Sequence, residues 1–175
     1  IHYYLGRELI KESGAAESEN IRKEMLASGI NELRRSIEIA PSYSDAHSQI
    51  GIGYSRLGDK REAIGFYESA LRLRPNDPIV LNNLAAEYFK ENRVEECVEM
   101  YKKVLSIDPM YLDAIINLGS CYGTLGQYEE AVNLFRRALE VNPNSKAANQ
   151  FMGVTLQRLG KQKEAQPFLS KASAL

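Results

Sequence analysis

The sequence predicts an all-α fold built from repeated pairs of antiparallel helices. Three observations support this prediction: a proline recurs every 34 residues, small and aromatic residues recur in the same register, and Gly or Asn recurs within each unit. The prolines are Pro41, Pro75, Pro109 and Pro143. A period of this length is typical of a helix–turn–helix unit that buries its apolar face against its neighbours.

Small and aromatic residues occupy fixed columns in the aligned units. A small residue allows two helix axes to approach closely, and an aromatic residue fills the space beside it. The small columns hold Gly51, Ala85, Gly119, Gly153 and Ala63, Cys97, Ala131, Ala165, and the aromatic column holds Tyr67, Tyr101 and Phe135. Gly58, Asn92, Gly126 and Gly160 are expected to form the turns, because Gly and Asn accept the left-handed conformation that ends a helix.

These columns resemble the tetratricopeptide repeat. The family pattern of Leu-Gly, Tyr, Ala, Phe or Tyr, Ala and Pro corresponds in one unit to Leu118-Gly119, Tyr122, Ala131, Phe135, Ala138 and Pro143. The resemblance implies a right-handed superhelical solenoid of helix pairs whose first helices line a concave groove. The predicted repeats are residues 44–77, 78–111 and 112–145, followed by a truncated C-terminal repeat, 146–175.

Residues 1–43 are predicted to form a degenerate N-terminal helix pair with an insertion near residues 13–20. Leu5-Gly6 fits the first-helix columns, and Pro41 fits the end of the second helix. Apolar spacing predicts that this second helix begins near residue 19 or 20 and is about two turns longer than the others. The alternative is a terminal segment that has no fixed packing partner.

Composition and charge exclude several classes of function. The chain has 22 Lys and Arg against 23 Asp and Glu, and so lacks the basic excess expected of a nucleic-acid-binding surface. No apolar stretch approaches the roughly 20 residues of a membrane-spanning helix, so direct membrane insertion of this segment is not expected. The sequence also lacks a signal peptide, and we expect a soluble, cytoplasmic segment. Its start at Ile1 is compatible with a cut from a longer protein.

No enzyme motif is present, and we expect a protein that is not an enzyme and has no cofactor or metal. There is no Gly-rich phosphate loop, nucleophile elbow or pair of metal ligands at helical spacing. His2 and His47 fall in a helix-packing column, which favours a packing role over proton chemistry. Two cysteines are too few for a disulfide framework, and Cys97 and Cys121 are interpreted as small buried hydrophobic residues.

The resemblance implies a protein–protein interaction scaffold that binds an extended peptide segment of a partner. The positions Gln49, Asn83, Asn117 and Phe151 are similar to the asparagine ladder in the repeat region of O-linked N-acetylglucosamine transferase. An amide both donates and accepts, which suits a peptide backbone. Alternatively, these amides bond only neighbouring helices or water. The predicted peptide-groove residues are Gln49, Ile52, Asn82, Asn83, Phe89, Ile116, Asn117, Gln150 and Phe151.

Two other functions remain open at this stage. The segment could be the scaffold domain of a larger enzyme, such as a membrane-bound glycosyltransferase. It could also be an assembly module that self-associates through the uncapped C-terminal repeat. In that repeat no polar capping helix follows Phe168 and Leu169, although terminal repeats need a polar outer face.

Overall fold

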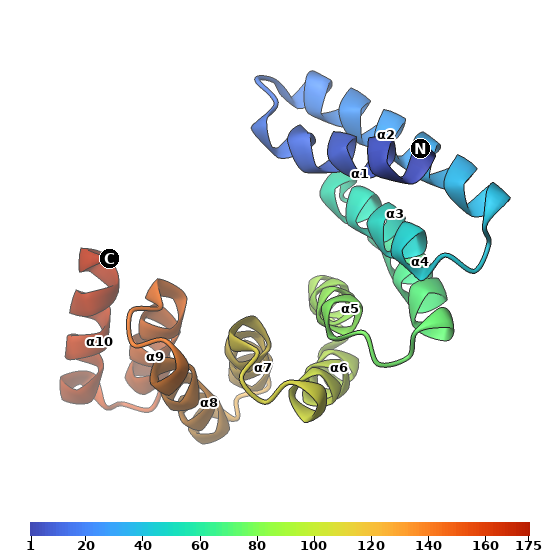
Figure 1. Ribbon diagram of the computed structural model, residues 1–175. Coiled ribbons are helices and arrows are strands. Elements are labelled where there is room, and N and C mark those ends of the chain that lie inside the picture. Colours follow the sequence, from blue (N-terminus) through green and yellow to red (C-terminus); the bar gives the residue numbers. More distant parts are fainter. The chain divides into compact units, whose positions relative to one another are not determined.

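The computed structural model describes residues 1–175 and contains ten α-helices, one short 3₁₀ helix and no strand (Figure 1). The predicted all-α fold class is confirmed. The chain divides into two compact units, Ile1–Glu91 (unit 1) and Asn92–Leu175 (unit 2). Each unit is a series of helices in which every helix packs on the next one in the sequence.

Unit 1 contains five α-helices and the 3₁₀ helix. They are α1 (His2–Glu12), η1 (Ser13–Ala15), α2 (Glu19–Ile39), α3 (Ser44–Leu57), α4 (Lys60–Leu73) and α5 (Pro78–Lys90). Beyond the sequential contacts, α3 also touches α1 and α5. The core between α1, α2 and α3 consists of Ile10, Leu26, Ile30, Leu33, Ala46 and Ile50.

The N-terminal helix pair is closely packed. Helix α2 begins at Glu19 and has 21 residues, whereas α4 has 14. A Cβ atom on Gly6 would lie 2.6 Å from the carbonyl oxygen of Gly29, and one on Gly29 would lie 2.9 Å from that of Gly6. The backbones of α1 and α2 therefore touch, and α2 in turn packs on α3. This packing argues against a terminal segment without a fixed partner.

Unit 2 contains the remaining five helices. They are α6 (Val94–Ile107), α7 (Leu112–Thr124), α8 (Tyr128–Val141), α9 (Lys146–Arg158) and α10 (Gln162–Ala174). Here α7 also contacts α9. The core of α7, α8, α9 and α10 includes Ile115, Ile116, Phe135, Met152, Leu156 and Ala165.

The predicted turn and packing columns are confirmed. Gly58, Asn92, Gly126 and Gly160 are the residues with positive φ, at 88°, 59°, 75° and 76°. In unit 1, a Cβ atom on Gly51 would lie 2.6 Å from the Tyr67 ring, and in unit 2 one on Gly119 would lie 2.6 Å from the Phe135 ring. Each of these glycines is therefore needed for the close approach of the two helices of one repeat.

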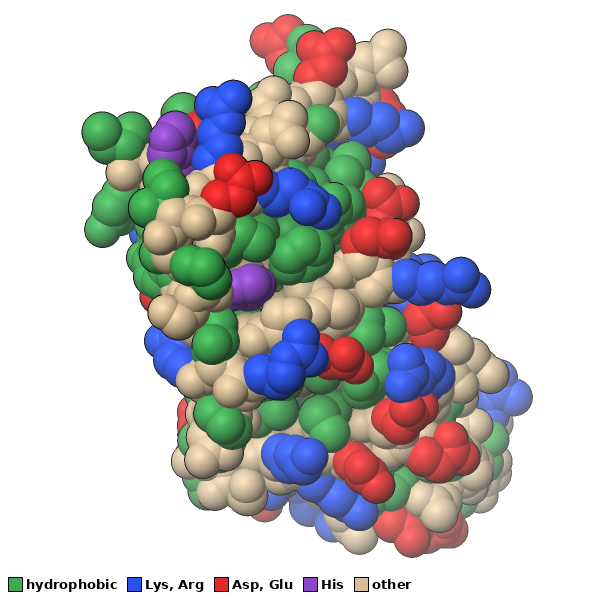
Figure 2. Space-filling model, turned by 90° about the vertical axis from the view of Figure 1, so that its right-hand side faces the viewer, with side chains coloured by type: hydrophobic (Ala, Val, Ile, Leu, Met, Phe, Trp, Pro, Cys, Tyr) green, Lys and Arg blue, Asp and Glu red, His purple; other side chains and the backbone are tan.

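The length and apolarity of the helices and the charges of the surface bear on the expectations from composition. None of the helices is both long and apolar enough to cross a bilayer. Figure 2 shows acidic and basic side chains interspersed on one face of the molecule, in keeping with the formal net charge of -1.

Candidate functional site

The structure places the predicted groove residues of unit 1 on two neighbouring helices. Gln49 and Ile52 lie on α3, whereas Asn82, Asn83 and Phe89 lie on α5. The two helices contact each other, and all five residues are at least partly exposed. We call the surface formed by these five residues the α3/α5 face.

A pocket of about 360 Å³ lies at this face. Its walls include Ile52, Ser55, Arg56, Asn83, Glu87 and Lys90. Two of the predicted residues, Ile52 and Asn83, therefore belong to one concave site. We call it the Glu87 pocket, because Glu87 is its only acidic lining residue.

Glu87 is buried in this wall, with only 2% of its surface exposed. Its Oε1 atom accepts hydrogen bonds from Ser55 Oγ at 2.5 Å and from Lys90 Nζ at 2.7 Å. Its Oε2 atom is buried and has no hydrogen-bond partner within the protein. An unpaired buried acceptor costs about 1–3 kcal/mol, and more when it is charged. The pocket therefore contains an acceptor that a bound group could satisfy.

Arg56 and Tyr67 define the electrostatics around this carboxylate. Arg56 donates to the carbonyl oxygen of Ile10, and its Nη1 atom lies 3.4 Å from Ser13 Oγ, so it connects α3 to the end of α1. Burial raises the pKa of Tyr67, and the negative charge of Glu87 raises it further. The Tyr67 hydroxyl therefore remains protonated and neutral at physiological pH.

Glu87 was not among the residues predicted from sequence, although one signal could have identified it. The 34-residue period aligns it with Gly53, Cys121 and Thr155, so Glu87 is the only charged residue in its column. Charged residues are rarely fully buried unless they are paired. A lone charge in a column of small, buried residues therefore indicates a specific local role.

In unit 2 the predicted residues Ile116 and Asn117 lie on α7, and Gln150 and Phe151 lie on α9. Gln150 is exposed, and Phe151 is 40% exposed with its ring centroid 5.8 Å from that of Phe135. Ile116 differs from the expectation of an apolar groove contact, because it is only 6% exposed and belongs to the unit 2 core. We call the surface of Asn117, Gln150 and Phe151 the α7/α9 face.

The ladder amides are free of protein partners. Gln49, Asn83 and Asn117 are partly exposed, and their side chains make no hydrogen bond within the protein. The structure therefore does not support the alternative that these amides bond neighbouring helices. Asn82 differs, because its Oδ1 atom is buried and unpaired.

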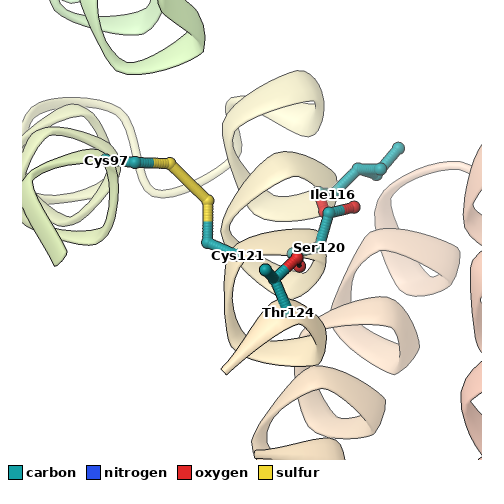
Figure 3. The surroundings of a disulfide bond; sticks show 5 residues. All are labelled: Cys97, Ile116, Ser120, Cys121 and Thr124. Atoms are coloured by element: carbon teal, nitrogen blue, oxygen red, sulfur yellow. Dashed lines mark hydrogen bonds between the residues drawn. A yellow bond between two sulfur atoms is a disulfide. The ribbon is translucent and has the colours of Figure 1, made fainter. Parts of the chain in front are cut away.

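The structure corrects the interpretation of Cys97 and Cys121 as no more than small buried hydrophobic residues. Both are buried as expected, at 0% and 1% exposed, but their sulfur atoms are joined in a disulfide between α6 and α7 (Figure 3). Cys97 occupies the small-residue column of a second helix, and Cys121 lies on the first helix of the next repeat. Two cysteines 24 residues apart therefore meet where α6 packs on α7.

The polar residues beside this disulfide are satisfied within α7. Ser120 Oγ donates to the carbonyl oxygen of Ile116 at 3.2 Å, and Thr124 Oγ1 donates to that of Ser120 at 3.0 Å (Figure 3). Both hydrogen bonds thus lie within α7, the helix that carries Cys121.

The two histidines have packing roles, as predicted. His2 Nδ1 lies 2.6 Å from Glu32 Oε2 and connects α1 to α2, and this hydrogen bond is the main reason that the pKa of Glu32 is lowered. His47 Nε2 donates to the carbonyl oxygen of Pro41 at 2.8 Å. No group of three or more His, Cys, Asp or Glu residues is placed to hold a metal ion.

Comparisons with known proteins agree with this architecture. Models of the tetratricopeptide repeat match residues 44–77, 78–111 and 113–145, which is more than half of the chain. A comparison with curated proteins gives no match.

Solved structures of MamA are similar in fold. The MamA structure from Desulfovibrio magneticus RS-1 has a TM-score of 0.84 at 20% identity, over 99% of this chain and 94% of that one. A second MamA crystal structure has a TM-score of 0.81 at 18% identity, over 87% and 89% of the two chains. At this level of identity the likeness is one of fold.

Proposed function

Since the chain belongs to the tetratricopeptide repeat family, we propose that it is a protein-interaction scaffold that binds an extended peptide segment of a partner protein. The binding surfaces in this proposal are the α3/α5 face of unit 1 and the α7/α9 face of unit 2. The observation that supports it best is the set of partly exposed amides, Gln49, Asn83 and Asn117, that have no hydrogen-bond partner in the protein.

Free amides on a helix face suit the main chain of a peptide. A side-chain amide donates through its NH₂ group and accepts through its oxygen, so it can bond both the C=O and the N–H groups of an extended segment. Such bonds do not depend on the side chains of the bound segment. The similarity to the asparagine ladder of O-linked N-acetylglucosamine transferase is part of this proposal.

Apolar side chains beside the amides would add contact area. Phe89 is 39% exposed on the α3/α5 face, and Phe151 is 40% exposed on the α7/α9 face. Aromatic residues contribute large areas at low entropic cost and are enriched in binding surfaces. Each face therefore combines an apolar anchor with at least one free amide.

The interspersed charges favour a protein partner over nucleic acid, because a phosphate backbone binds to clustered Lys and Arg. We propose no reaction, cofactor or metal for these residues.

The test uses short peptides with randomised sequences, from which binders are selected on the wild-type protein. Replacing both Asn83→Ala and Asn117→Ala should weaken binding of a selected peptide by about fivefold or more, as expected for the loss of two or more hydrogen bonds. Asn31→Ala, at an exposed position on α2, is the matched control and should leave affinity unchanged. Unchanged affinity of a folded double variant, checked by circular dichroism, would contradict the proposal.

Self-association is a second candidate with weaker support. Phe168 and Leu169 on α10 are partly buried and pack against the unit 2 core, so they leave less apolar surface than the sequence suggested. Light scattering over a concentration series tests this candidate, because a constant monomer mass would exclude it. The full-length reading frame would decide whether the segment is the scaffold domain of a larger enzyme.

A further inference from the structure

We propose that the Glu87 pocket recognises an uncharged amide side chain, Gln or Asn, of the bound segment. This inference rests on the proposed function, because the pocket would read one side chain of a peptide that lies on the α3/α5 face. It adds a sequence preference to a surface whose free amides bind any peptide backbone.

The buried carboxylate sets the first requirement, which is a hydrogen-bond donor. Glu87 Oε1 already accepts from Ser55 and Lys90, whereas Oε2 is buried without a donor. An apolar ligand side chain would leave Oε2 unpaired, so it would gain nothing from this atom. A ligand N–H group that reaches Oε2 would instead remove the penalty of the unpaired acceptor.

The charges of the pocket set the second requirement, which is a ligand without net charge. The lining contains two cations, Arg56 and Lys90, and one anion, Glu87, which Lys90 already pairs. A ligand Lys or Arg would be a third cation near one carboxylate. A ligand Asp or Glu would face Glu87 Oε2 with no proton to donate.

A side-chain amide meets both requirements. Its NH₂ group can donate to Glu87 Oε2, while its carbonyl oxygen can accept from Arg56 or Lys90. Both cations belong to exposed residues of the pocket lining. A volume of about 360 Å³ lies at the lower end of the range of roughly 300–1,000 Å³ for ligand pockets, which suits one side chain and not a large cofactor.

Because Oε2 is buried, a ligand reaches it only when an exposed side chain of the pocket lining shifts, and Lys90 is such a side chain. The Lys90 side chain is 47% exposed and belongs to the last turn of α5, so its methylene chain can shift while its ammonium group continues to donate to Oε1. The ligand carbonyl could then accept from the same ammonium group.

The residues of unit 2 that correspond to Glu87 and Asn83 on α5 are different. The preference for an amide side chain is therefore confined to the Glu87 pocket. The column of Glu87 holds Thr155 on α9, and Phe151 replaces Asn83 in the ladder column. The α7/α9 face thus keeps the ladder amide Asn117 on α7, but α9 has neither the carboxylate nor the amide that α5 has at these two positions. A single amide residue in the bound segment is therefore expected to be selected.

The test uses pools of short peptides with a fixed central residue and randomised flanks, and measures binding by fluorescence anisotropy. The central residue is Gln, Asn, Glu, Lys or Leu. The Gln and Asn pools should bind about threefold or more tightly than the others, since one net hydrogen bond is worth about 1 kcal/mol. Glu87→Leu should remove this preference but leave binding of the Leu pool in place.

Two further variants keep the test decisive. Glu87→Gln retains a side-chain oxygen acceptor and should keep part of the preference, and it replaces Glu87→Leu if that variant fails to fold. Glu99→Leu, at an exposed position on α6, makes the same substitution outside the pocket and should bind all pools like the wild type.

The possible failures of the two proposals are distinguishable. If no pool binds, the proposed function fails and the inference with it. If all pools bind equally, or if the Glu or Lys pool binds best, a peptide-binding face remains and the amide-reading pocket is overturned; equal binding is also the result expected if only water occupies the site. A preference that survives in folded Glu87→Leu would likewise overturn it.

Discussion

The contact between α4 and α5 in unit 1 and that between α6 and α7 in unit 2 use the same two columns of the repeat. In unit 1 these columns hold Ala63 and Glu87; 34 residues later, in unit 2, they hold Cys97 and Cys121. The first pair leaves a buried carboxylate with one unpaired oxygen, whereas the second forms a disulfide. The repeat therefore fixes where two helices meet and leaves the chemistry of the contact free to differ.

This difference separates stability from binding. The disulfide constrains the unfolded chain and so stabilises unit 2 without any ligand. The unpaired Oε2 atom of Glu87 lowers the stability of unit 1, and a bound donor could remove this destabilisation. The following predictions test this contrast.

The largest effect is expected from removing the disulfide. The double substitution Cys97→Ala and Cys121→Ala should lower the free energy of unfolding of the oxidised protein by about 3.5 kcal/mol, the entropic value for a loop of this length. Urea denaturation with and without reductant measures it. The wild type should lose a similar amount in reductant, and the double variant should not respond. A wild type insensitive to reductant would contradict the stabilising role.

A smaller loss is expected from Lys90→Met. This substitution leaves the buried Glu87 carboxylate with Ser55 as its only donor, which should cost about 2 kcal/mol, less than for a fully buried pair because Lys90 is 47% exposed. Urea denaturation should show a much smaller loss when Glu87→Gln is already present. Lys103→Met on α6 is the exposed control and should stay within about 0.5 kcal/mol of the wild type. Equal losses in both backgrounds would mean that Lys90 does not act through Glu87.

The contact between a glycine and an aromatic ring is common to both units, and the same substitution should destabilise each unit equally. Gly51→Ala and Gly119→Ala each push a methyl group into an aromatic ring, at a cost of about 2 kcal/mol that the higher helix propensity of Ala reduces to about 1 kcal/mol. Gly65→Ala and Gly123→Ala are matched controls in α4 and α7, because no atom lies within 4 Å of the added methyl group. These controls should be neutral or stabilising. Thermal unfolding that shows no loss for either packing variant would contradict the close approach.

The smallest effect concerns Tyr67, whose counterpart in unit 2 is Phe135. The pKa of Tyr67 is raised in the folded protein, so its contribution is fully present below the unfolded-state pKa of about 10 and is lost as pH rises above it. Tyr67→Phe should therefore lose less stability than the wild type between about pH 8 and about pH 11. Tyr4→Phe, at a position 62% exposed, should behave like the wild type. Urea midpoints at the two pH values measure the difference.

Much of the fold could be predicted because it depends on local signals that recur. The turn residues, including Asn92 with its positive φ, and the Gly51 and Gly119 contacts all follow from columns in the sequence. The second helix of the N-terminal pair begins at Glu19, close to the start that the apolar spacing predicts.

The remaining features depend on how one repeat is positioned against the next. Glu87 is an ordinary helix residue by sequence, and its burial depends on packing between helices, where Ser55 on α3, 32 residues earlier, donates to its carboxylate. Ile116 was predicted to face the groove, but α9 places Met152 in the same core cluster. The disulfide requires the register of α6 on α7, which the alignment of columns alone did not reveal. The role of the groove amides stays a prediction.

The link between Cys97 and Cys121 also limits how far the chain can be stretched. A covalent bond across 24 residues withholds about 80 Å of extended chain from a pulling force applied to the two ends, at roughly 3.4 Å per residue. Under load, the oxidised protein would therefore lengthen less than the reduced one when its helices come apart, and the difference would correspond to most of α6, the connection that follows it and most of α7.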